Sequence, residues 1–152
     1  MKDASKEIRD WLYTTLNGYL SYSGSNVPVY TVPDKNTSMP YVIIGEISSP
    51  GEDGTKDKFI NEYDISIEIW TDFTGNIATY VPADSIANSI LQRVRTWAAT
   101  SGYDRDEGPV AINSAFNVIR VNMRGMVTDR FLNEERIVVY KSVNINLLVE
   151  EV

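Results

Sequence analysis

The chain has 152 residues, and its 14 Lys and Arg against 21 Asp and Glu give a formal net charge of −7. This length suits one domain over residues 1–152, and 43% hydrophobic residues can build its core without disulfides. Cys and His are absent, which excludes disulfides, thiolate or imidazole metal sites and nucleophiles that depend on either residue. The acidic balance argues against an autonomous nucleic-acid-binding domain, since such domains need clustered Lys and Arg.

No apolar run approaches the roughly 18 residues of a membrane helix. The N-terminus, Met1 to Asp10, mixes charges where a signal peptide needs an apolar stretch. These two observations predict a soluble, intracellular protein without membrane contact.

The first predicted element is an amphipathic helix from Ser5 to Leu20. Its apolar residues recur at spacings of three and four, as the buried stripe of a helix requires. Ser5 is expected to cap the helix, with Asp3 near its positive end. The Ser-, Gly- and Asn-rich stretch from Ser21 to Pro28 ends it.

Three strands are predicted next, over Val29–Val32, Tyr41–Ile47 and Tyr63–Ile69. In the third, apolar residues alternate with polar ones, a period of two that gives one buried and one wet face. The stretch from Ser48 to Lys58 contains Pro, Gly and charged residues and is expected to be a solvated loop.

A second helix is expected to open at Pro82 and to end before Ser101 and Gly102. Two strands then close the chain, Phe116–Val127 and Ile137–Val149. The apolar phase of the first shifts between Val118 and Ile119, which predicts a β-bulge, and a hairpin tip is expected at 129–135.

The predicted order is helix, three strands, helix, two strands. Clean alternation indicates strands with one packed face, so the expected fold class is α+β: a mostly antiparallel sheet with both helices packed on one face.

The sequence contains no phosphate-binding loop and no nucleophile elbow. The acidic loop around Glu52, Asp53 and Asp57 does not match a calcium loop, since Lys56 falls where that loop needs Gly. Asp64 and Glu68 share a strand face but are separated by roughly 13 Å at about 3.3 Å per residue, too far for a glycosidase pair. We therefore expect no catalytic residue, no metal site and no cofactor.

Trp70 lies on the polar face of its strand, where an exposed indole needs a cover. A subunit interface and a packing contact at the sheet edge both remain open. Charge is also uneven, because residues 46–72 hold eight acids and two bases while residues 92–136 hold seven Arg and six acids. This polarity suits head-to-tail self-association, although a solvated face explains it as well.

Four segments in a fixed order carry a family resemblance. They are EIRDWLYTTL, VPVYTVPDKNTSMPYVIIGEIS, EYDISIEIWTD and ADSIANSILQRV. A short strand ending near Pro33 precedes a strand from Pro40 to Gly45. A strand ending in Trp70 and Thr71 and then a helix follow. In this order the chain resembles the tail terminator, or tail completion, proteins of long-tailed bacteriophages.

The resemblance implies a structural protein without catalysis that assembles as a ring of six subunits. That ring would cap the tail tube and join it to the head connector or neck proteins, at the head-proximal end of the tail in the virion, after assembly in the host cytoplasm. Genomic DNA would pass through it without specific binding. The candidate subunit interface comprises Trp70, Asp72, Phe73, Arg120 and Arg124.

A ring that DNA traverses should not hold it, and an acidic lumen would repel the phosphates. The candidate lumen or partner-facing acids are Glu52, Asp53, Asp57, Asp64 and Glu68.

Three alternatives remain. The chain could be another neck or minor tail protein, a small enzyme using carboxylates or Tyr, or a monomeric module whose acidic loops meet a basic partner.

Overall fold

The computed structural model describes residues 2–33, 36–52, 59–74, 80–100, 110–133 and 136–152. Its elements in chain order are α1 (Ser5–Leu16), β1 (Ser21–Tyr22), β2 (Ser25–Asn26), β3 (Val29–Tyr30), β4 (Tyr41–Glu52), β5 (Ile60–Thr74), α2 (Val81–Thr100), β6 (Val110–Ala111), β7 (Phe116–Asn133) and β8 (Arg136–Glu151). The predicted order of the main elements is confirmed, and the short strands β1, β2 and β6 are additions to it.

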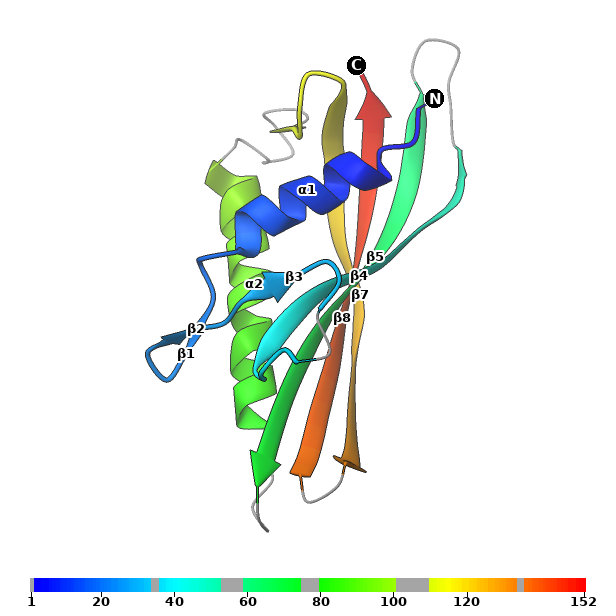
Figure 1. Cartoon of the computed structure of the whole chain (residues 1–152). Coiled ribbons are helices and arrows are strands. Elements are labelled where there is room, and N and C mark those ends of the chain that lie inside the picture. The colour runs from blue at the N-terminus through cyan, green and yellow to red at the C-terminus, as the bar shows by residue number, and fades with distance from the viewer. Residues whose placement is uncertain (1, 34–35, 53–58, 75–79, 101–109, 134–135) are drawn as a thin grey trace.

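The main sheet has the strand order β3-β4-β5-β8-β7-β6, and a separate small sheet pairs β1 with β2. Only the β3–β4 pair of the main sheet is parallel, and its other pairs are antiparallel. Both helices lie on the same side of this long, twisted sheet (Figure 1). The α+β class with two helices on one face is therefore confirmed.

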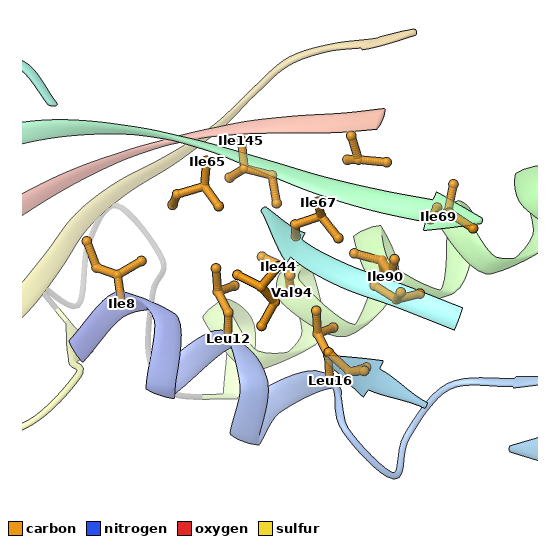
Figure 2. Packing of buried hydrophobic residues seen from close by; sticks show 14 of the residues in the cluster. Ile8, Leu12, Leu16, Ile44, Ile65, Ile67, Ile69, Ile90, Val94 and Ile145 are labelled. Atoms are coloured by element: carbon orange, nitrogen blue, oxygen red, sulfur yellow. The ribbon is translucent and has the colours of Figure 1, made fainter. Parts of the chain in front are cut away.

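The core lies between the helices and the inward face of the sheet. Ile8, Leu12 and Leu16 of α1 point toward β4 and β5, while Ile90 and Val94 of α2 approach from the second helix (Figure 2). Four successive inward positions of β5 are apolar and fully buried, namely Tyr63, Ile65, Ile67 and Ile69. The alternation predicted for this strand is confirmed.

The start of α1 differs from the prediction. Ser5 is the first helical residue rather than the cap, and Ala4 precedes it without a side-chain cap. The Asp3 carboxylate instead accepts hydrogen bonds from the Ser5 N–H and hydroxyl, which lowers the pKa of Asp3. The buried Tyr63 hydroxyl accepts the Ala4 N–H at 3.0 Å, so a strand side chain fixes this end of the helix.

Several elements have other bounds than expected. The helix ends at Leu16 rather than Leu20, and β4 continues through Glu52, into the segment predicted to be a loop. β7 extends to Asn133, well past the predicted end at Val127. Ser48, Gly51 and Glu52 of β4 and the residues of β7 after Val127 pair with a neighbouring strand, and these hydrogen bonds outweigh the loop-forming tendency of Gly and Asp.

The expected bulge near Val118 is confirmed as a register shift between Val118 and Arg120. A second shift on β7 falls between Met123 and Gly125, and two more interrupt β4. Through the pairing register, all four lie level with Val143–Val149 of β8, whereas the β5–β8 pair has no shift. β4 and β7 are therefore irregular at one end of the sheet, whereas β5 and β8 between them pair regularly along their whole length.

Two cationic side chains tie the helices to the sheet. The Arg9 guanidinium on α1 donates to the carbonyl oxygens of Ile44 and Gly45 on β4, both at 2.9 Å. Lys141, a largely buried residue of β8, pairs with Asp84 in the first turn of α2. Burial of the ammonium therefore depends on the position of α2.

We predict that Leu12→Ala lowers the free energy of unfolding by about 2–5 kcal/mol, because it leaves a cavity where α1 meets the sheet. Urea unfolding measures the change. The matched control is Lys6→Ala on the exposed side of the same helix, with an expected change within about 0.5 kcal/mol. Equal effects of the two substitutions would contradict the described orientation of α1.

Candidate interaction surface

The sheet face opposite the two helices is called the open face below. On β5 the open face carries the residues that alternate with the buried isoleucines. The residues of β4, β8 and β7 that lie level with them in the pairing register point to the same face. These residues include Tyr41, Ile43, Ser48, Glu62, Asp64, Ser66, Glu68, Trp70, Asp72, Arg120, Asn122, Val127, Asp129, Phe131, Val138, Tyr140, Ser142, Asn144, Asn146, Leu148 and Glu150.

One end of the open face carries five aromatic side chains, here called the aromatic row: Tyr30, Tyr41, Trp70, Phe131 and Tyr140. Trp70 is the centre of the row. Its ring stacks on Tyr41 with centroids 6.4 Å apart, meets Tyr140 at 4.8 Å and receives Phe131 edge-on at 6.0 Å. Tyr30 extends the row beyond Tyr41, at 6.2 Å. The row thus runs from β3 to β7, and such contacts stabilise beyond the burial of area.

The Trp70 indole N–H is buried and has no hydrogen-bond partner in the described part of the chain. Beside it, Glu68 packs closely against β4. A Cβ atom at Gly45 would lie 2.9 Å from the Ser66 carbonyl oxygen and 3.1 Å from a Glu68 carboxylate oxygen. Glycine is therefore required at residue 45, where Glu68 folds over the strand.

Two tyrosines of the row have altered acidity. Partial burial raises the pKa of Tyr41, and the negative charge of Glu68 adds to this. Burial likewise raises the pKa of Tyr140; a hydrogen bond with Ser142 opposes this rise, and Glu68 reinforces it. Both rings are thus held in the neutral phenol form more firmly than a free tyrosine.

The other end of the open face is polar and self-paired. Arg124 bonds Glu62 at 2.6 Å and lies 3.8 Å from Asp64, while the fully buried Asn146 donates to both carboxylates. Glu62, Asp64 and Arg124 line an open hollow of about 750 Å³, with Glu46, Ser48, Ile65, Ser66 and Asn144 as its further lining residues. Arg124 and the Asn146 side-chain amide therefore bridge the carboxylates of Glu62 and Asp64.

The structure distributes the candidate interface residues over two faces. Trp70 and Asp72 lie on the open face, where Asp72 pairs with Arg136 at 2.7 Å. Phe73 is on the opposite face and packs against the core. Arg120 is exposed on β7, and Arg124 is bound to Glu62.

The candidate acids Asp64 and Glu68 do share the open face. Glu52 ends β4, and Asp53 and Asp57 lie outside the described residues.

One feature of β7 was missed by reasoning from the sequence. The strand was predicted to end at Val127, but it continues to Asn133, and its second half exposes apolar side chains. They are Met126, Val127, Phe131 and Leu132, with exposed fractions of 48%, 58%, 42% and 73%. The apolar dipeptides on either side of Thr128–Arg130 were the available signal, since they continue the strand pattern.

Comparison with known proteins rests on the fold. No family model matches the sequence, and no curated protein matches it. The structure is similar to a chain in the solved structure described as "Virion of native gene transfer agent (GTA) particle". The TM-score is 0.57 at 15% sequence identity, and the match covers 91% of this chain and 84% of that chain. The two chains share a fold over nearly their whole length.

Within the described residues, no helix is both long and apolar enough to pass through a bilayer. The same residues contain no group of three or more side chains that could hold a metal ion.

We predict that Glu68→Gln lowers the pKa of Tyr41 and Tyr140 toward the ordinary value of about 10, because it removes a neighbouring negative charge. In the wild type, stability should fall as the pH rises above about 10, since unfolded tyrosines ionise before these two. The decline should be shallower in the variant. Absorbance titration of the phenols and urea unfolding across this range measure both effects.

The control for this titration is Glu46→Gln, which removes an exposed carboxylate elsewhere on the sheet. Identical tyrosine titrations in the two variants would contradict a role for Glu68.

Proposed function

We propose that this chain is a structural virion protein, and specifically a tail terminator that forms a ring of six subunits between the tail tube and the head connector. The observation that carries the proposal is the shared fold, over 91% of this chain, with a chain of the gene transfer agent virion. The order of the four sequence segments, which resembles the tail terminator family, gives the finer position.

The charge of the open face supports a place beside passing DNA. Among its described residues and their neighbours on the same face, seven are carboxylates and three are arginines: Glu46, Glu62, Asp64, Glu68, Asp72, Asp129 and Glu150, with Arg120, Arg124 and Arg136. A ring with this face toward its axis has an excess of negative charge along the lumen, which repels phosphates. The helices then lie on the outside.

The proposed partners follow from this position. Copies of the chain contact one another around the ring, the tail tube protein meets one end and the connector or neck proteins meet the other. Trp70, Asp72, Arg120 and Arg124 remain candidates for these contacts, whereas the packing of Phe73 in the core gives it a supporting role.

A different neck or minor tail protein is the second candidate. The matched structure is described as a whole virion, so its description fits any position within the particle.

Electron cryomicroscopy of particles that contain this chain tests the proposal. We predict a closed ring of six copies at the head-proximal end of the tail, with Asp64 and Glu68 directed toward the axis. Copies at another position in the particle would contradict the terminator assignment. A ring whose open face points outward would contradict only the acidic lumen.

A further inference from the structure

We propose that the two edges of the main sheet pair with each other in neighbouring copies of the chain. β7 of one copy lies antiparallel beside β3 and β4 of the next, and the sheet and the aromatic row continue across the contact. This inference rests on the proposed function, since it specifies how subunits of the ring meet.

The first edge is β7, which is largely uncovered. β6 pairs only with Asn117 and Val118, so the segment from Ile119 to Asn133 has no strand on its outer side among the described elements. Met126 and Leu132 are exposed on the helix side and Val127 and Phe131 on the open face. A long edge strand with apolar side chains on both faces readily pairs with another chain.

The second edge is divided into two parts. β3 pairs with Val42 and Ile43, and Arg9 occupies the carbonyl oxygens of Ile44 and Gly45. From residue 46 to residue 52, β4 has no strand on its outer side among the described elements. The available partners for β7 are therefore the outer side of β3 and the second half of β4.

Strand direction makes this pairing possible without rearrangement. Successive antiparallel pairs from β4 through β5 and β8 to β7 leave β4 and β7 running in opposite directions. Rotation about a ring axis keeps the direction of each strand along that axis. It therefore brings β7 of one copy antiparallel to β4 of the next, as a continuous antiparallel sheet requires.

Charge is complementary along the second half of β4. Residues 46–52 contain two acids and no base, whereas residues 119–125 of β7 contain Arg120 and Arg124 and no acid. The register places these segments at the same end of the sheet, since Ser48 pairs with Asp64, Asp64 with Asn146, and Asn146 with Asn122. Glu46 and Arg120 are both exposed and able to meet a neighbour.

Apolar groups match at the other end. Tyr30 and Phe131 are the two ends of the aromatic row, and each lies in an outer strand. Through the register Tyr30 is level with Val127, which lies on the same face of β7 as Phe131, four residues before it. In neighbouring copies Tyr30 would therefore cover Val127, which is exposed in the single chain and continues the apolar surface of Phe131.

A second copy of this chain fits these edges better in head-to-tail order than in a two-fold pair. Pairing β7 with β7 of another copy around Asp129 brings two aspartates directly opposite each other, which is destabilising. This two-fold pairing also leaves Glu46 on the edge of β4 without a basic residue opposite it. Head-to-tail pairing uses both edges and closes when the ring is complete.

Crosslinking in assembled particles tests this contact, because the natural chain contains no Cys. The double variant Ser48→Cys/Asn122→Cys carries one thiol near each edge, at two exposed positions of the open face. A flexible bis-maleimide should link it into a ladder that ends at the number of subunits in the ring. Each single variant should remain monomeric on a denaturing gel.

The outcomes separate this inference from the proposed function. Dimers from a single variant would show two-fold contacts, and particles with an imaged ring but no ladder from the double variant would show another contact. Either result overturns the edge pairing and leaves the ring intact. Absence of a ring at the neck overturns the proposed function instead. Thr14→Cys/Asn122→Cys, with one thiol moved to exposed α1, is the matched control and should give no ladder.

A charge exchange tests the same contact independently. Glu46→Arg and Arg120→Glu should each reduce incorporation into particles by about tenfold, and the double variant should restore most of it. Circular dichroism melting confirms that each variant is folded. Lys6→Glu on the exposed side of α1 is the control and should be incorporated as the wild type. Failure of the double variant to recover, with its fold intact, would overturn the pairing of these edges.

Discussion

The uninterrupted ladder between β5 and β8 is the constraint on which the rest of the structure depends. All 15 residues of β5 pair with β8 in a single register. Because side chains alternate across a strand, this register assigns Ile65, Ile67 and Ile69 to the core and Glu68 and Trp70 to the open face. A slip by one residue would exchange the two sets, so burial of the isoleucines also determines which groups face outward.

The same alternation explains what could be predicted from the sequence. Alternation along the strand is enough to predict the face on which Trp70 lies and the face that Asp64 and Glu68 share, and both predictions are confirmed. Parity also places Phe73 with the isoleucines, so its position in the core could have been read from the sequence.

Other features depend on contacts between distant segments and left no local signal. Strand β4 continues through a segment containing Pro50 and Gly51 because β5 lies beside it. Tyr41 and Tyr140 join Trp70 only once β4 and β8 are placed in register on either side of β5. Ser5 is a plausible helix cap by composition, yet the Tyr63 hydroxyl and the Asp3 carboxylate, one of them distant in sequence, satisfy the first N–H groups.

The register shifts of β4 and β7, on either side of the regular β5–β8 pair, affect how further strands can add to the sheet. β4 and β7 each contain two register shifts, all at one end, while the strands between them are regular. Bulged strands bend and twist more strongly than regular ones, so the margins of this sheet depart from the flat geometry in which identical strands stack without limit. An edge shaped in this way disfavours amyloid-like fibrils while leaving room for a curved, self-limiting association.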